Sequence, residues 1–182
     1  MNVFIVTGKR NEGKSSYLNR LYIFLNGSGL KIGGFISPGK ISESGNKDFV
    51  LQRLNEKSIM HLASREYHRA YEQIGAFFFN QEAIKKGDSI IEAELKEKCD
   101  IFILDEIGPM ELSGKVWHDT LKRILAMHSG ILIISVRKEM LKKVIDYFGL
   151  KDVAIIDIKK TKPETAGKKI LNIENYNRSL KQ

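Results

Sequence analysis

The residues whose types and spacing indicate chemistry most clearly lie between positions 8 and 16. The stretch "GKRNEGKSS" fits the pattern G-x-x-x-x-G-K-[S/T], with Gly8, Gly13, Lys14 and Ser15 at the defined positions. Glycines allow the backbone to turn its N–H groups inward around phosphate oxygens. A lysine supplies a mobile charge for β- and γ-phosphates, and a serine hydroxyl can coordinate Mg²⁺. The pattern predicts a phosphate-binding loop, and the alternative is a glycine-rich turn with a solvated lysine.

The flanking residues favour the phosphate-binding interpretation. The apolar run "VFIV" (3–6) precedes the loop, and a segment with helical spacing follows it. A helix beginning near Gly13 would present its unpaired N–H groups and positive dipole end to an anion. Lys14 is also predicted to be catalytic, and Ser15 to be a Mg²⁺ ligand. We assign the whole segment to nucleotide binding: Gly8, Lys9, Arg10, Asn11, Glu12, Gly13, Lys14, Ser15 and Ser16.

Two consecutive carboxylates supply what a phosphate loop needs as an acidic partner. Asp105 and Glu106 follow the apolar run "IFIL" (101–104), so they are expected at the carboxyl end of a buried strand, the edge where open α/β sheets bind ligands. We predict that Asp105 is a Mg²⁺ partner. We predict that Glu106 is catalytic and orients or deprotonates the attacking water. The alternative is an acidic pair at the start of a helix.

Arg137 is the third predicted catalytic residue. It follows the apolar run "ILIISV" (131–136), again at the carboxyl end of an expected strand. An arginine at this edge can reach a γ-phosphate and stabilise charge in the transition state. The alternative is a salt bridge with an acidic residue of a neighbouring loop.

The elements that must position these residues are visible as four continuous apolar runs. They are typical of strands covered on both faces, as in a parallel sheet. Helical patterns occupy residues 81–98, with Asn80 as N-cap, residues 117–128, and residues 138–149, with Gly149 as C-cap. This alternation predicts an open α/β sheet. The four runs are "VFIV" (3–6), "IFIL" (101–104), "ILII" (131–134) and "VAII" (153–156).

Residues 27–66 differ from the rest because they are rich in glycine and serine. Two strand-like pieces, Lys31–Ser37 and Asp48–Leu54, predict a β-hairpin inserted after the first helix. The triple aromatic of "AFFFN" (76–80) fits a core position, with stacking on a base as the alternative. We expect one domain covering residues 1–182.

Composition limits the classes of protein. The chain has 182 residues, 42% hydrophobic and 29% charged, and no run long enough for a transmembrane helix. Cys99 is the only cysteine, which favours a reducing, cytoplasmic setting. The net charge of +8 comes from basic residues scattered among acidic ones. It is compatible with a nucleic-acid partner without indicating one, and it does not determine an oligomeric state.

Beyond these patterns, the chain resembles the cancer-related nucleoside-triphosphatase family. The resemblance rests on "VTGKRNEGKSS" (6–16), "GGFIS" (33–37) and above all "DEIGPMEL" (105–112), and it spans most of residues 1–150. The proline form of the last motif, with Trp117 and "SVRKEMLKKV" (135–144), resembles one subgroup.

The resemblance implies a RecA-like P-loop fold of three layers with a mostly parallel central sheet. It also implies slow, Mg²⁺-dependent hydrolysis of ATP, GTP and other nucleoside triphosphates with weak base selectivity. The chain departs from the family after "GGF": the segment "ISPGKISESGNKDF" has no arginine before Arg53. The 38–47 loop therefore offers lysines but no arginine to close over a γ-phosphate.

Two other functions remain open at the level of sequence. A P-loop kinase of a small molecule would use the same loop and the same Asp105, although this chain has no arginine-rich insertion that would serve as a lid. A nucleotide-dependent switch could bind RNA or a protein through its basic surface.

Overall fold

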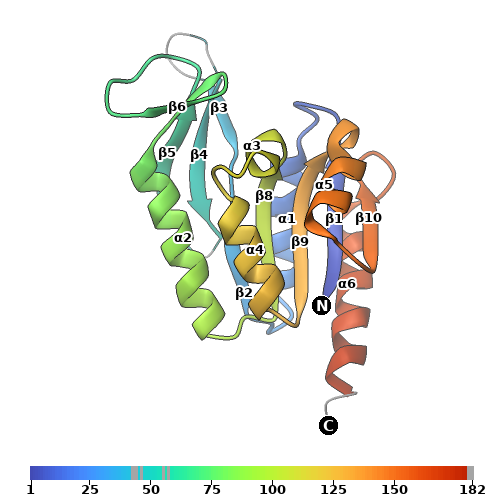
Figure 1. Cartoon of the computed structure of the whole chain (residues 1–182). Coiled ribbons are helices and arrows are strands. Elements are labelled where there is room, and N and C mark those ends of the chain that lie inside the picture. The colour runs from blue at the N-terminus through green and yellow to red at the C-terminus, as the bar shows by residue number, and fades with distance from the viewer. Residues whose placement is uncertain (42–44, 46, 55, 57, 180–182) are drawn as a thin grey trace.

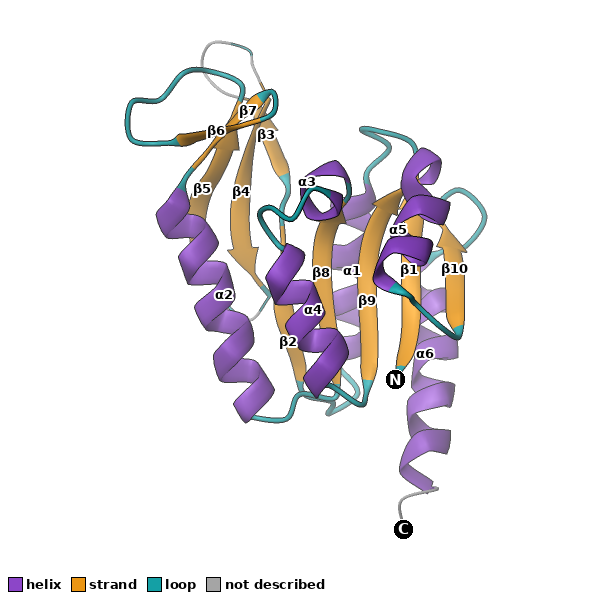
Figure 2. Ribbon diagram, in the orientation of Figure 1, coloured by secondary structure: helices purple, strands orange, loops and turns teal. Residues whose placement is uncertain are grey.

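One sheet runs through the described part of the chain, with helices on both faces (Figures 1 and 2). The computed structural model describes residues 1–182 except 42–44, 46, 55, 57 and 180–182. Among the described residues the sheet has ten strands in the order β10-β1-β9-β8-β2-β4-β5-β7-β6, with β3 paired to β4. The strands are β1 (Asn2–Gly8), β2 (Ile32–Ile36), β3 (Gly39–Ile41), β4 (Lys47–Arg53), β5 (Ile59–Ser64), β6 (Glu72–Ile74), β7 (Phe77–Phe79), β8 (Ile101–Ile107), β9 (Ile131–Arg137) and β10 (Val153–Asp157).

The helices form the outer two layers of a three-layer α/β fold, as predicted. Figure 2 shows α2, α4 and α5 over one face of the sheet and α1 and α6 over the other. No described helix is long and apolar enough to span a membrane. The helices are α1 (Lys14–Asn26), α2 (Gln81–Lys96), α3 (Pro109–Leu112), α4 (His118–Met127), α5 (Leu141–Phe148), preceded by a 3₁₀ turn (Lys138–Met140), and α6 (Pro163–Ser179).

The parallel half of the sheet comprises β10, β1, β9, β8 and β2. All four neighbouring pairs are parallel, and each predicted apolar run lies within one of the strands. β1 lies between β10 and β9, with Val3 opposite Val153 on one side and Leu132 on the other. Because helices cover both faces, consecutive residues of β1, β8 and β9 are buried, which confirms the physical reason for reading these runs as strands.

The antiparallel half comprises β3 to β7, and it is larger than the predicted hairpin. β2 and β4 do pair antiparallel, with Phe35 opposite Arg53, so that the two predicted pieces meet. However, β2 is also a parallel neighbour of β8, and the antiparallel strands continue through β5, β7 and β6. The prediction missed β5, β6 and β7. β6 and β7 have only three residues each, too few to show a period.

The predicted helix boundaries agree with the structure within a few residues. The Asn80 side chain accepts a hydrogen bond from the Glu82 N–H at 3.1 Å and caps α2, and Gly149 ends α5 in the left-handed conformation. The predicted helix over 138–149 begins instead as a 3₁₀ turn, and α6 was not predicted.

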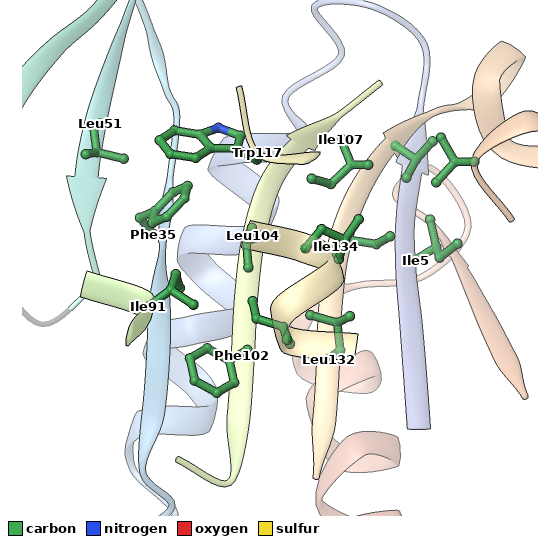
Figure 3. Close-up of a cluster of buried hydrophobic side chains, with 14 of the residues drawn as sticks. Ile5, Phe35, Leu51, Ile91, Phe102, Leu104, Ile107, Trp117, Leu132 and Ile134 are labelled. Carbon is green, nitrogen blue, oxygen red and sulfur yellow. The ribbon is translucent and has the colours of Figure 1, made fainter. Parts of the chain in front are cut away.

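The core on the α2 and α4 face explains how the site is held. Trp117 packs on Phe35 with ring centroids 4.5 Å apart, beside Leu104, Ile107 and Ile134 (Figure 3). α2 makes room for the indole with Gly87, because a Cβ there would lie 2.5 Å from the Trp117 ring. The large aromatic thus ties the segment before α4 to β2 and α2.

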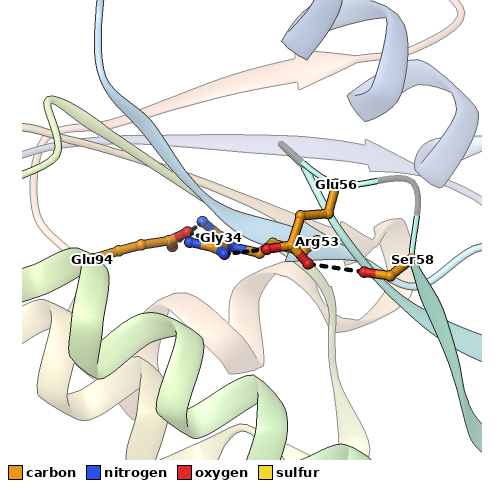
Figure 4. A network of polar contacts seen from close by, with 5 residues as sticks. All are labelled: Gly34, Arg53, Glu56, Ser58 and Glu94. Atoms are coloured by element: carbon orange, nitrogen blue, oxygen red, sulfur yellow. Dashed lines mark hydrogen bonds and ion pairs between the residues drawn. The ribbon is translucent and has the colours of Figure 1, made fainter.

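The "GGF" segment has a steric explanation. Gly34 has φ +107°, and a Cβ at this position would lie 2.0 Å from the backbone oxygen of Ile103. The Gly34 N–H donates to Glu94 on α2, whose other oxygen accepts from Arg53 Nε at 3.0 Å (Figure 4). The two glycines therefore bring β2 against β8 and place the next residues, including Ser37, at the carboxyl end of β8.

Candidate nucleotide-binding and catalytic site

The predicted phosphate loop connects the first strand, β1, to α1. Gly13 is the N-cap of α1 and has φ +91°, a left-handed conformation that favours glycine. No side chain caps this helix end, so its first N–H groups are free of side-chain acceptors within the described residues. A helix end of this kind, at the carboxyl edge of a parallel sheet, is suited to bind an anion.

Lys14 lies inside the loop rather than in solvent. Only 4% of the residue is exposed, and its Nζ donates to the backbone oxygen of Lys9 at 3.1 Å. The alternative of a solvated lysine is therefore wrong. A small hollow that we call the phosphate-loop cavity, about 140 Å³ in volume, is lined by Asn11, Gly13, Lys14, Ser15, Ser16, Pro38, Gly39, Phe49 and Glu106.

The first half of the loop is fastened to the segment that follows β10. Glu12 accepts from the Lys9 N–H at 2.6 Å and forms an ion pair with Lys159 at 2.7 Å. The Lys159 hydrogen bond and the Lys9 N–H hold the pKa of Glu12 below its usual value. Gly8 packs on Ile158, while the Lys9 and Arg10 residues are exposed. Of the nine predicted residues, Gly8, Lys9, Arg10 and Glu12 shape or flank the loop rather than line the cavity.

Asp105 is completely buried at the end of β8, and neighbouring strands hold both of its oxygens. One oxygen accepts from the Ser37 N–H at 3.0 Å, and the other accepts from Ser135 Oγ at 2.5 Å. Ser135 Oγ also accepts from the Glu106 N–H at 2.9 Å. Ser37 and Ser135 were not among the site residues predicted from the sequence. The signal that could have identified them is their position at the ends of β2 and β9, the strands that flank Asp105.

Glu106 occupies an irregularity in β8. The pairing of β8 with β9 shifts between Leu104 and Ile107, and Glu106 has φ +65°, which is uncommon for a residue other than glycine. Strain of this kind concentrates at functional sites. The residue is partly exposed and lines the phosphate-loop cavity beside Lys14. The two carboxylates therefore differ in setting, since Asp105 is buried and Glu106 faces the cavity.

Arg137 forms an ion pair with a carboxylate of the neighbouring strand β8. Its Nη2 lies 3.5 Å from Glu106 Oε2, so it does form a salt bridge. Its partner, however, is the predicted catalytic carboxylate, and about a quarter of the guanidinium side chain remains exposed. The structure therefore brings Lys14, Glu106 and Arg137 to one place.

A second hollow, which we call the apolar cavity, adjoins this place. It also measures about 140 Å³ and shares Lys14, Phe49 and Glu106 with the phosphate-loop cavity. Its other lining residues are Ser37, Leu62, Ala63, Phe77, Phe79, Ile107, Gly108, Pro109, Met110, Glu111, Val116, Trp117, Ser135 and Arg137. Phe77 and Phe79 of "AFFFN" thus belong to a partly packed wall of this cavity.

Glu111 fixes the loop that forms one wall of the apolar cavity. Its carboxylate accepts from the Gly108 N–H at 2.8 Å and from the Trp117 N–H at 3.4 Å. Burial raises the pKa of this carboxyl to about 7, even though both N–H groups favour its charged form. Glu111 lies in the "DEIGPMEL" segment, but no pattern in that segment distinguishes the role of its carboxylate from that of Glu106.

The donors at the phosphate loop fit a Mg²⁺ ion bound together with a nucleotide. Ser15 lines the phosphate-loop cavity, and Asp105 and Glu106 lie near the carboxyl end of β8. Among the described residues no group of three or more His, Cys, Asp or Glu side chains could hold a metal by itself. Mg²⁺ at nucleotide sites usually keeps phosphate and water oxygens among its ligands.

The insertion does not supply an arginine to this site. Arg53 points to α2 and bonds Glu94 and Glu56, the latter joined to Ser58 (Figure 4). Lys40 lies exposed on β3, and Pro38 and Gly39 reach the phosphate-loop cavity. Residues 42–44 and 46 of the 38–47 loop lie outside the described residues. The described part of the loop thus contributes backbone and an apolar ring to the site.

Comparison with known proteins gives a consistent assignment. A family model described as NTPase matches residues 3–171. The nucleoside-triphosphatase THEP1 of Methanothermobacter thermautotrophicus is 29% identical over 143 residues, which are 77% of this chain and 79% of that protein. THEP1 of Thermotoga maritima (strain ATCC 43589 / DSM 3109 / JCM 10099 / NBRC 100826 / MSB8) is 24% identical over 180 residues, with 98% of both proteins covered.

Two solved structures have the same fold. The crystal structure of THEP1 from Aquifex aeolicus has a TM-score of 0.63 at 17% identity and covers 94% of this chain and 96% of that one. The solution structure of a human cancer-related nucleoside triphosphatase has a TM-score of 0.65 at 16% identity and covers 98% of both chains. With a family model spanning most of its length, and with the phosphate loop and acidic pair in place, the chain belongs to the NTPase family.

Proposed function

We propose that this protein hydrolyses nucleoside triphosphates to nucleoside diphosphate and phosphate, with Mg²⁺ and with little choice among bases. The observation that carries the proposal is the meeting of Lys14, Glu106 and Arg137 where the phosphate-loop cavity adjoins the apolar cavity. We also infer that residues 1–182 act as one domain, because the parallel and antiparallel strands form one continuous sheet.

The residues have separate tasks in this proposal. Backbone N–H groups of residues 9–16 and the first turn of α1 would hold the phosphates. Lys14 Nζ would leave the Lys9 oxygen and pair with the β- and γ-phosphates. Ser15 and Asp105 would hold Mg²⁺, with Asp105 fixed by Ser37 and Ser135. The bound ion would neutralise charge on the phosphate oxygens.

Hydrolysis then requires an activated water at the γ-phosphate. Glu106 would orient this water and accept its proton, since its carboxylate faces the phosphate-loop cavity while Asp105 is buried. Arg137, already paired with Glu106, would stabilise charge on the γ-phosphate oxygens as the bond to the leaving group breaks. No covalent intermediate is needed.

Weak base selectivity follows from what the loop can contact. Backbone N–H groups sense phosphate oxygens and not the base. The test is phosphate release from ATP, GTP, CTP and UTP, with Mg²⁺ and with the metal removed by a chelator. We expect release from all four nucleotides, and its loss without metal. Release from only one nucleotide would contradict the base selectivity, and undiminished release without metal would contradict the assignment of Ser15 and Asp105.

A further inference from the structure

The apolar cavity is larger and less polar than a water molecule requires. One water takes up about 30 Å³ of liquid and needs two to four polar partners, whereas an apolar cavity of about 150 Å³ can hold benzene. The cavity here measures about 140 Å³. Its walls come from β4, β5, β7, α3 and the segment before α4, and they are mainly aromatic and aliphatic: Phe49, Leu62, Phe77, Phe79, Met110 and Trp117.

The apolar cavity adjoins the part of the loop to which the proposed function assigns the γ-phosphate. It shares Lys14 and Glu106 with the phosphate-loop cavity, and these are the residues assigned to the terminal phosphate and its attacking group. Arg137 and Ser135 line only the apolar cavity. A molecule held by the apolar walls would therefore present one end to the bond that breaks.

The polar end of the cavity contains a group with no partner. Ser37 is 3% exposed, and its buried Oγ has no hydrogen-bond partner among the described residues. A buried hydroxyl of this kind usually finds a partner, because an unpaired one loses its hydration without gaining a hydrogen bond. A hydroxyl group on a bound ligand would satisfy it at the position where the ligand meets Lys14 and Glu106.

Backbone strain is also concentrated around the cavity. Val116 has φ +52°, a rare conformation for a β-branched residue, and Glu106 has φ +65°. Both residues line the cavity. The Glu111 hydrogen bonds to Gly108 and Trp117 hold the two ends of the strained segment in place. Strain of this kind persists where surrounding structure maintains a site.

We propose that the apolar cavity binds a small aromatic alcohol and that its hydroxyl takes the place of water as acceptor of the γ-phosphoryl group. This inference rests on the proposed nucleotide site. The ring would pack among Phe49, Phe77 and Trp117, and the hydroxyl would lie near Ser37 and Glu106. The hydroxyl oxygen forms a bond to the γ-phosphorus while the bond from phosphorus to the β–γ bridging oxygen breaks. The hydroxyl proton passes to Glu106 and then to solvent, so that alcohol and nucleoside triphosphate give phosphate ester, nucleoside diphosphate and a proton.

Benzyl alcohol is a suitable probe, with toluene as the matched compound that lacks the hydroxyl. Binding is measured without nucleotide, by saturation-transfer NMR and by the fluorescence of Trp117, the only tryptophan in the chain. We expect both compounds to bind with Kd on the order of 1 mM. With Mg²⁺ and ATP added, benzyl alcohol should yield benzyl phosphate by mass spectrometry, and toluene should yield no ester.

Two substitutions of the same kind locate the site. Met110→Trp, on the partly buried α3, would fill the apolar cavity and should weaken binding at least tenfold by NMR. Met127→Trp, at a methionine that is 68% exposed on α4, should bind like wild type. Absence of binding to the wild-type protein, by NMR and by Trp117 fluorescence, would overturn the proposal while leaving phosphate release intact. Binding to the cavity without any benzyl phosphate would overturn the transfer step.

Discussion

The parallel and antiparallel halves of the sheet are built differently and contribute different chemistry. In the parallel half, β1, β8 and β9 have seven residues each and are largely buried on both faces, and this half carries Lys14, Asp105, Glu106 and Arg137 at one edge. The antiparallel half includes three-residue strands, such as β3 with all of its residues exposed, and contributes Phe49, Leu62, Ala63, Phe77 and Phe79 to the apolar cavity. The charged groups therefore lie on the parallel half, while the antiparallel half supplies much of the apolar wall.

This difference explains how one chain can place a phosphate-binding loop beside an apolar cavity. Parallel strands end together, so their terminal residues form a compact polar edge. The antiparallel strands, attached through β2 and β4, extend past that edge and enclose the space beside it. Changes in the two halves should consequently have separable effects on turnover and on stability.

The largest effect is expected for Lys14→Ala in the parallel half. The phosphates would lose their countercharge, and hydrolysis should fall by at least about 10³-fold. Phosphate release by the folded variant measures this. Lys142→Ala, at an exposed lysine of α5, is the control and should hydrolyse like wild type. Near-normal turnover in Lys14→Ala would remove the phosphate loop from the mechanism.

Glu106→Gln should slow hydrolysis by roughly 10²-fold while nucleotide binding is retained, because the amide cannot accept the water proton. Single-turnover rates and nucleotide affinity are to be measured together. Glu139→Gln, at an exposed glutamate, serves as the comparison. If affinity falls as far as the rate, Glu106 holds the metal or the structure and is not the base.

Arg53→Ala tests the attachment of the antiparallel half. The variant removes the Arg53 partner of Glu94, which is only 3% exposed, and should lower the free energy of unfolding by about 2 kcal/mol. Turnover should change less than about twofold, since Arg53 faces α2 and not the site. Urea denaturation and phosphate release give the two values, with exposed Arg69 replaced by alanine as control. A large loss of turnover at unchanged stability would mean that Arg53 acts on the nucleotide.

Glu111→Gln should alter how stability depends on pH. The pKa of Glu111 is about 7 in the folded protein against an ordinary value of 4.5. Because its pKa is raised in the folded protein, protonation of Glu111 stabilises the fold. This contribution to stability is fully present below about pH 4.5 and is lost as pH rises to about 7, by at most about 1.4 kcal/mol per pH unit. The variant should show a flatter dependence over this window, measured by urea denaturation. Parallel curves for the wild type and the variant would show that Glu111 titrates normally.

Among the three catalytic substitutions, Arg137→Ala is expected to lower the rate least, by about tenfold, with little change in nucleotide affinity. Its charge matters most in the transition state, and Lys14 and Mg²⁺ would still neutralise the ground state. The measurement compares the change in kcat with the change in KM. Unchanged kinetics would leave Arg137 as only the salt-bridge partner of Glu106.

The local patterns of the chain were sufficient to predict the phosphate loop and the parallel strands. Gly8, Gly13, Lys14 and Ser15 are adjacent in sequence, so one short segment contains both the motif and the start of α1. Continuous apolar runs predict β1, β8 and β9 because burial on both faces removes alternation. The run that predicts β10 is also continuous, although Ile155 of this strand is exposed. The position of Asp105 at the end of β8 followed from the same runs.

The partners of these residues and the apolar cavity depend on contacts between segments that are distant in sequence. Ser37 and Ser135 are distant in sequence from Asp105, and they meet it because β2 and β9 flank β8. The apolar cavity needs side chains from β5 and β7 against α3 and Trp117, and a three-residue strand such as β7 carries no readable period. Adjacent residues were thus enough to predict the phosphate loop, whereas long-range strand pairing placed the apolar cavity beside that loop.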